Sequence, residues 1–164
     1  VSALDVSVQA QVLALLRGLQ RERNIGILFI SHDLAVVRSI SHRVAVLYRG
    51  ALMEVGETDE VYSPPYHPYT HVLLSAVPDI DPDKPIATVR GGIEEEIITE
   101  TKPACAFANS CPWKLGSICD EVVPPRRKVS EFHEVRCHIP LEDLYAMEKP
   151  LGDPIAAMSH ISES

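Results

Sequence analysis

A histidine that follows a short apolar segment is the residue best placed for chemistry in this sequence. Residues 25–30 predict a buried β-strand, and Ser31-His32-Asp33 comes directly after it. Open α/β sheets bind their ligands at the carboxyl ends of their strands, and an imidazole can donate a hydrogen bond to a phosphate oxygen at physiological pH. A lone histidine at a strand end is more often a surface or hydrogen-bonded residue. Spacing alone therefore leaves both interpretations open.

Four cysteines in the second half of the chain form the other candidate site: Cys105, Cys111, Cys119 and Cys137. None belongs to a C-x-x-C pair of the kind that structural zinc uses. Disulfides are disfavoured in a cytosolic protein, whereas four thiolates suit a 4Fe–4S cluster, whose ligand spacing is looser. His133 and His138 lie close to Cys137 in sequence and could replace a thiolate. A 4Fe–4S cluster, zinc, and free or oxidised thiols all remain open.

The elements that must position these residues alternate between helix and strand, which predicts an α/β fold. Apolar side chains recur at helical spacing in the first helix, Asp5 or Ser7 can cap it, and Asp33 can cap the second. In chain order the predicted elements are a helix over 8–20, the strand over 25–30, a helix over 34–40, strands over 44–48 and 51–55, a short helix over 58–62 and a helix that begins near 68.

The character of the chain changes after this alternating part. Pro78, Pro82 and Pro85 predict an extended linker. The residues beyond it carry all four cysteines and few periodic segments. We therefore divide the chain into residues 1–77, and residues 78–164 with the linker and a small irregular cysteine-rich extension.

Composition limits the classes of protein to consider. The chain has 164 residues, 46% of them hydrophobic, enough for a packed core. Its net charge of −8 argues against nucleic acid as a partner. No apolar stretch approaches the roughly 20 residues of a membrane-spanning helix, and because no basic segment followed by an apolar one is visible near Val1, we expect no secretory signal. Because the first residue is Val1, we expect an upstream portion to be absent.

Short segments in a characteristic order run through most of the chain. They are Ser2-Ala3-Leu4-Asp5, Ser7 to Gln11, Phe29 to Val37, Arg43 to Tyr48, His67-Pro68-Tyr69-Thr70, Leu73 to Pro78 and Cys105 to Pro112. Together these segments resemble the ATP-binding subunits of dipeptide/oligopeptide ABC transporters. The resemblance is close over residues 1–77 and loose after Cys119. It implies the C-terminal part of a P-loop NTPase nucleotide-binding domain, followed by the family's C-terminal extension.

The resemblance also implies roles for individual residues. His32 would contact the γ-phosphate and steady the attacking water or the leaving phosphate, which fits the importance of positioning in phosphoryl transfer. Asp5 would belong to the loop that links one ATP site to the partner subunit. Ser2 and Ser31 would lie beside these two residues at the nucleotide and the subunit interface. The sequence contains no G-x-x-x-x-G-K-[ST] phosphate loop, and the catalytic Glu and the signature loop of the family are also missing.

From the same resemblance we expect an ATPase that powers uptake of dipeptides or oligopeptides when intact, and no hydrolysis by this polypeptide alone. The implied cofactors are ATP and Mg²⁺, with a 4Fe–4S cluster on the four cysteines favoured over Zn²⁺. The implied partners are a second ATPase subunit and membrane permease subunits. The implied location is peripheral, on the cytoplasmic side of the cell membrane.

Two further interpretations stay open. The chain could be a metal-binding regulatory or interaction module that never binds nucleotide, or a free-standing iron–sulfur redox protein. If the chain is a fragment, the sheet around residues 25–30 and 44–48 has unpaired edges, which recruit other chains. We therefore expect the isolated fragment to form a homodimer or a strand-swapped assembly.

Overall fold

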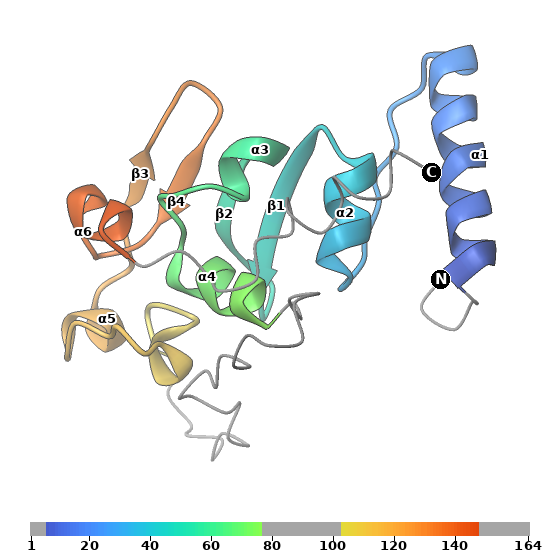
Figure 1. Ribbon diagram of the computed structural model, residues 1–164. Helices are drawn as coiled ribbons and strands as arrows, with labels where there is room; N and C mark the ends of the chain where they lie inside the picture. Colours follow the sequence, from blue (N-terminus) through green and yellow to red (C-terminus); the bar gives the residue numbers. More distant parts are fainter. Residues whose placement is uncertain (1–5, 77–102, 148–164) are drawn as a thin grey trace. The chain divides into compact units, whose positions relative to one another are not determined.

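The computed structural model describes residues 6–76 and 103–147. The chain divides between His42 and Arg43 into two compact units, which are described separately. The first unit contains two helices, and the second contains a four-stranded sheet with short helices around it (Figure 1).

Helices α1 (Val6–Arg23) and α2 (Leu34–Ile40) form the described part of the first unit and confirm both predicted helices. The Asp33 carboxylate accepts a hydrogen bond from the backbone N–H of Val36 at 3.1 Å, so it caps α2 as expected. The Arg17 guanidinium of α1 donates to the backbone carbonyl of Ser39 near the end of α2. This contact ties the two helices together.

The prediction of a strand over residues 25–30 is wrong, because this segment has no regular secondary structure. Leu28 is 90% exposed and Ile30 is 87% exposed, so the apolar run is not buried. A buried strand needs hydrogen-bonded neighbours. The described residues of the first unit supply helices and no other strand. The apolar run of residues 25–30 therefore has no strand to pair with among the described residues of this unit.

The second unit is built on an antiparallel sheet with the strand order β1-β2-β4-β3. Strand β1 (Arg43–Tyr48) pairs with β2 (Ala51–Glu57), which confirms the two strands predicted over 44–48 and 51–55 and joins them in a hairpin. A second hairpin, β3 (Arg126–Lys128) and β4 (Glu134–Arg136), joins the far side of β2. One sheet thus contains strands from both sides of the predicted division at residue 77; that division remains a prediction.

A tight turn connects β1 to β2. Arg49 has a φ of 48° and Gly50 a φ of 81°, so both central residues lie in the left-handed region. Two successive positive φ values are typical of a type I′ hairpin turn, whose twist matches that of the strands. Glycine at the second position adopts this conformation without a steric cost. The turn therefore fixes the register at the end of β1.

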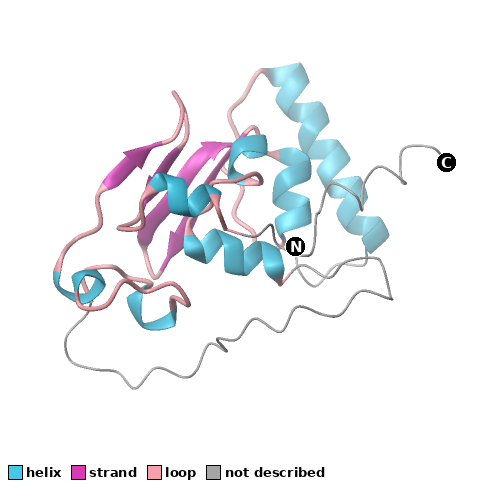
Figure 2. Ribbon diagram, turned by 60° about the vertical axis from the view of Figure 1, so that its left-hand side comes forward, coloured by secondary structure: helices cyan, strands magenta, loops and turns pink. Residues whose placement is uncertain are grey.

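Short helices surround the sheet, as Figure 2 shows. They are α3 (Thr58–Val61), α4 (Pro68–Ser75), the 3₁₀ helix η1 (Ala108–Ser110), α5 (Ile118–Glu121) and α6 (Leu141–Tyr145). Two buried clusters lie among them. One joins Met53 of β2 to Cys105, Phe107, Ala108 and Cys119, and the other joins Val135 to Cys137, Ile139 and Leu144. The cysteine-bearing segments therefore take part in the core.

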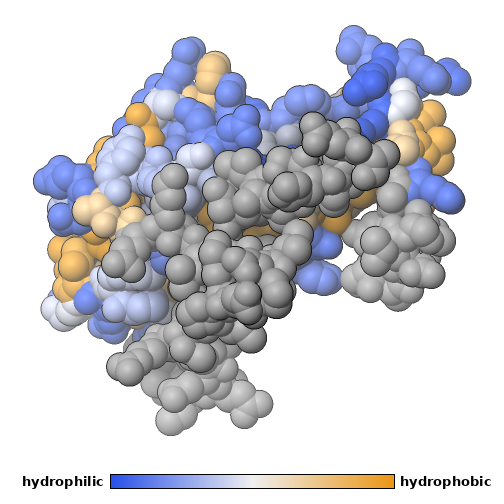
Figure 3. Space-filling model, in the orientation of Figure 1, coloured by the Kyte–Doolittle hydropathy of each residue, from blue (hydrophilic) through white to orange (hydrophobic). Residues whose placement is uncertain are grey.

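Some apolar side chains of the second unit remain on the surface. Leu115, Ile118, Val122 and Val123 are 42–59% exposed and gather around α5 (Figure 3). In the part of the chain that the structure describes, no helix combines the length and the apolar character needed to cross a bilayer.

Candidate functional site

His32 lies in a short ordered turn immediately before α2. The Ser31 hydroxyl accepts a hydrogen bond from the backbone N–H of Asp33 at 3.0 Å. The Asp33 backbone carbonyl in turn accepts one from Val37 at 3.0 Å. These bonds fix the backbone on the C-terminal side of His32, while its side chain is exposed. The imidazole is thus available to a ligand or a partner, as a phosphate-contacting residue must be.

The other two residues predicted for the nucleotide and subunit interface are Ser2 and Asp5. Both lie outside the described residues. Their placement beside Ser31 and His32 therefore remains a prediction.

The four cysteines are free thiols, and three of them are buried. The backbone N–H of Cys105 donates to the carbonyl of Cys119 at 2.9 Å, and that of Ala104 donates to Asp120 at 2.8 Å. These two bonds hold the segment around Cys105 against α5. Arg127 of β3 donates to the carbonyls of Cys137 and His138 at 3.0 and 3.1 Å. The backbone around three of the four cysteines is therefore fixed by hydrogen bonds.

Burial governs the ionisation of these thiols. It raises the pKa of Cys111 to about 12 and that of Cys137 to about 11, because a thiolate loses hydration in the core. The pKa of Cys105 is raised for the same reason. Backbone amides act in the opposite direction, since those of Phe107 and Ala108 stabilise the Cys105 thiolate and that of Trp113 stabilises the Cys111 thiolate. Burial thus keeps the Cys105, Cys111 and Cys137 thiols protonated at neutral pH, although the positive charge of Arg136 acts to lower the pKa of Cys105.

The charges of other cysteine thiolates also raise the pKa of Cys111 and of Cys137. The thiolates of Cys137, Cys105 and Cys119 all raise the pKa of Cys111, and those of Cys105 and Cys119 raise the pKa of Cys137. The charge of one thiolate therefore adds to burial in opposing the ionisation of Cys111 and Cys137. No group of three or more His, Cys, Asp or Glu side chains within residues 6–76 and 103–147 converges closely enough to hold a metal ion.

These observations bear on which cofactor the cysteines could hold. A single zinc ion needs four donors at about 2.3 Å from one point, and the described side chains do not converge in this way. A 4Fe–4S cluster spreads its ligands over four irons, and it is tuned by hydrogen bonds to the sulfurs. The described side chains thus form no metal site as they lie, and the choice among a 4Fe–4S cluster, zinc and free thiols stays open.

A second cluster of polar groups, which the sequence did not suggest, surrounds Glu54 in the middle of β2. Glu54 is only 1% exposed. One carboxylate oxygen accepts from the backbone N–H of His67 at 2.9 Å and from the Thr70 hydroxyl. The other lies 2.7 Å from Nε2 of His133, which is also 1% exposed. Glu54 thus joins β2, the N-terminus of α4 and the β3–β4 turn.

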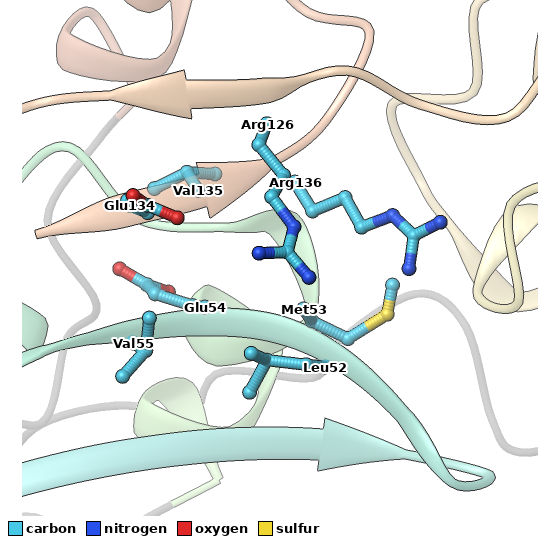
Figure 4. Close-up of a pocket in the computed structure, with 8 residues that line it drawn as sticks. All are labelled: Leu52, Met53, Glu54, Val55, Arg126, Glu134, Val135 and Arg136. Atoms are coloured by element: carbon cyan, nitrogen blue, oxygen red, sulfur yellow. The ribbon is translucent and has the colours of Figure 1, made fainter.

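The register of the sheet and a glycine make this arrangement possible. Glu54 pairs with Val135 of β4, and Figure 4 shows these two residues facing each other across neighbouring strands. Gly56 lies beside His133: a Cβ at this position would be 3.0 Å from Cδ2 of the His133 ring. Only glycine lets the imidazole approach β2 closely enough to reach the carboxylate without a shift.

His67 has a structural role that the sequence left unexplained. It is the N-cap of α4, where its Nδ1 accepts from the backbone N–H of Tyr69 at 3.0 Å. Its own N–H donates to Glu54, and its ring also bonds to the backbone of Arg136. Burial lowers the pKa of His67 to about 3, because an imidazolium would lose its hydration, while the bond to Arg136 acts in the opposite direction.

This lowered pKa predicts a loss of stability in mild acid. Below pH 6.5 the unfolded chain protonates this histidine, whereas the folded chain does so only near pH 3. The free energy of unfolding therefore falls by about 2 kcal/mol between pH 6.5 and pH 5. His67→Asn, which keeps an N-cap acceptor, should remove this part of the pH dependence. Urea unfolding of both proteins at the two pH values measures it, and an equal fall in both would contradict the assignment.

The sequence contained partial signals for these residues. The His67-Pro68-Tyr69-Thr70 segment stood out as a helix start, and Glu54 is a charge inside an otherwise apolar strand. Nothing local linked Glu54 to His133, which is 79 residues away. Only the pairing of β4 with β2 brings the two together.

The sequence of this chain is similar to those of known transporter proteins. Residues 53–119 match the family model of the oligopeptide/dipeptide transporter C-terminal region. The chain is 45% identical over 139 residues to a peptide import ATP-binding protein of Brucella abortus, a match that covers 85% of the chain and 40% of the relative. Over most of its own length the chain is thus similar to the ATP-binding proteins of peptide ABC transporters.

Two further relatives show the same similarity. A peptide ABC transporter ATP-binding protein of Sinorhizobium fredii is 45% identical over 141 residues, covering 85% of this chain and 39% of that protein. A peptide import ATP-binding protein of Brucella ovis is 46% identical over 139 residues, which cover 84% of this chain and 43% of that protein. The chain thus spans about two fifths of the length of the relatives it matches.

Proposed function

We propose that this chain is part of the ATP-hydrolysing subunit of an ABC importer that takes up dipeptides or oligopeptides. The observation that carries the proposal is the 45% identity to peptide import ATP-binding proteins over 85% of the chain. ATP and Mg²⁺ bind to the intact subunit. This chain, which contains no phosphate loop, does not hydrolyse ATP by itself.

In the proposed subunit His32 contacts the γ-phosphate of ATP. Its exposed side chain and the hydrogen-bonded turn at Ser31 and Asp33 support this role. Phosphoryl transfer depends mainly on positioning and charge stabilisation, which an imidazole on a hydrogen-bonded turn can supply as a hydrogen-bond donor. Ser31 lies beside His32, and Asp5 and Ser2 contribute to the contact with the second ATPase subunit.

We assign the four cysteines to a 4Fe–4S cluster with a structural or redox-sensing role. Cys105, Cys111, Cys119 and Cys137 would hold the irons, and bonding to iron would offset the cost that burial imposes on their thiolates. When bound, the cluster would supply a one-electron redox centre, held by Cys105 and Cys119 from one buried group of side chains and by Cys137 from the other.

This assignment predicts the metal content of protein purified without oxygen. We expect about four irons per chain and a broad absorption band near 400 nm. Cys119→Ser should lower the iron content, while Ser117→Ala, two residues away and exposed, should not. Zinc in place of iron would overturn the cluster, and a folded second unit without metal would overturn the metal centre altogether.

The proposed partners are a second ATPase subunit and the membrane permease, at the cytoplasmic face of the cell membrane. Within the intact subunit, strands next to residues 25–30 would cover the exposed side chains of Leu28 and Ile30. For the isolated chain we propose a homodimer or a strand-swapped assembly. A monomer in sedimentation at tens of micromolar would contradict this.

A chimera tests the transport function. The segment of the Sinorhizobium fredii relative that matches this chain is replaced by the chain, and the chimera replaces the relative in its host. Uptake of radiolabelled peptides that depends on the relative should be restored. Loss of uptake by a chimera that is produced and folded would favour the alternative, a metal-binding module that never binds nucleotide.

A further inference from the structure

We propose that Arg17 is a positioning residue for His32, which it holds in place through helix α2. This inference rests on the proposed role of His32 in ATP hydrolysis and adds a residue to that site. Arg17 lies in α1, outside the turn that carries His32, and its side chain is half-buried.

Helix α2 has little of its own to stabilise it. It contains seven residues, and none of their side chains is buried. Isolated helices shorter than about 12–15 residues are marginal in water, and helices in proteins gain most of their stability from a packed apolar face. The hydrogen bonds at the two ends of α2 therefore contribute a large share of its stability.

The first turn of α2 is bonded to the turn that carries His32. The Asp33 carboxylate accepts from the N–H of Val36 at 3.1 Å, and the Asp33 carbonyl accepts from Val37 at 3.0 Å. Both bonds close the first turn of the helix, so they are lost when α2 unwinds. The backbone directly after His32 is thus ordered together with α2.

Arg17 acts at the opposite end of α2. Its guanidinium donates to the backbone carbonyl of Ser39, which is the residue before the last one of the helix. The last four carbonyls of a helix have no partner within the helix, and the helix dipole favours a cation at this end. Arg17 therefore satisfies one of these carbonyls with a charge-assisted hydrogen bond, and α1 and Asp33 hold α2 from its two ends.

Hydrogen–deuterium exchange in the 164-residue chain tests this contact. Arg17→Ala removes the guanidinium but suits α1, because alanine is the best helix former. Amides of residues 36–41 should exchange at least about fivefold faster, because α2 opens more often. Arg17→Lys, which keeps a positive donor, should stay within about twofold of the unaltered chain.

Arg21 provides the matched control, since it is an exposed arginine near the end of the same helix. Arg21→Ala should leave exchange at residues 36–41 unchanged. Equal exchange rates in Arg17→Ala and the unaltered chain would show that Arg17 does not stabilise α2, and the inference would be wrong whatever the function of the protein.

Kinetics of the chimera test the consequence for His32. Arg17→Ala should lower kcat for MgATP hydrolysis at least about threefold and change KM by less than about twofold, because orientation is lost and nucleotide binding is not. Arg17→Lys should retain the rate. In a chimera that already carries His32→Ala, Arg17→Ala should cause no further fall, because the two residues act as a unit.

The outcomes separate this inference from the proposed function. If the effects of Arg17→Ala and His32→Ala multiply in the double variant, Arg17 acts elsewhere and the positioning role is wrong. An unchanged kcat in Arg17→Ala, beside a normal fall in His32→Ala, would also contradict the positioning role and leave the proposed function intact. If His32→Ala keeps the full rate, the proposed role of His32 fails and the positioning role fails with it, even where exchange at residues 36–41 still depends on Arg17.

Discussion

Replacing His32 by alanine in the chimera is expected to lower kcat for MgATP hydrolysis by about 100- to 1000-fold, the usual loss when one preorganised donor to developing charge is removed. The affinity for ATP should change by less than about threefold, because one hydrogen bond to the γ-phosphate is a small part of nucleotide binding. Steady-state rates over a range of ATP concentrations separate the two effects.

His42 provides the matched control for this experiment. It is another exposed histidine, close to the opposite end of α2, and no role in the site is assigned to it. His42→Ala should retain kcat within about twofold. If His32→Ala also keeps the full rate, the imidazole does not take part in hydrolysis, and the proposed role of the turn at Ser31 and Asp33 is wrong.

The largest expected effect on stability comes from Glu54. Glu54→Ala leaves the donors of His67, Thr70 and His133 without their buried acceptor, and it also opens a cavity in the sheet. Each buried donor left without its acceptor costs about 1–3 kcal/mol, so the loss of three such bonds is a large part of the 5–15 kcal/mol typical of a whole domain. We expect the free energy of unfolding in urea to fall by the sum of these costs.

Two further variants keep this prediction testable even if Glu54→Ala does not fold. Glu54→Gln keeps the side-chain volume but presents an N–H₂ group to one of the three donors, so it should cost about 1–3 kcal/mol. Glu131→Gln makes the same chemical change at an exposed position of the β3–β4 turn and should cost less than about 0.5 kcal/mol. Equal stabilities for these two variants would show that the buried contacts contribute little.

The features that were predicted correctly are those set by local sequence. Asp33 caps α2 through its own backbone neighbourhood, and the two strands predicted over 44–48 and 51–55 form β1 and β2. Pro68 lies in the first turn of α4, where its missing N–H costs nothing. Such interactions span only a few residues, so they can be recognised in a sequence.

The features that were missed depend on residues far away in the chain. Residues 25–30 have an apolar pattern, but strand formation also requires a neighbouring strand. A strand was also missed. Residues 126–128 have no apolar pattern and still form β3, because β4 pairs with β3 on one side and with β2 on the other. The buried Glu54–His133 contact follows from the same long-range pairing.

The proposed transport function requires that this chain completes an ATP-hydrolysing subunit. The rate of MgATP hydrolysis by the purified chimera tests this requirement most directly. The predicted result is a rate within about tenfold of that of the Sinorhizobium fredii relative, as expected when the catalytic groups are retained. The isolated chain should give no rate above background. A correctly folded chimera that is no faster than the isolated chain would contradict the claim.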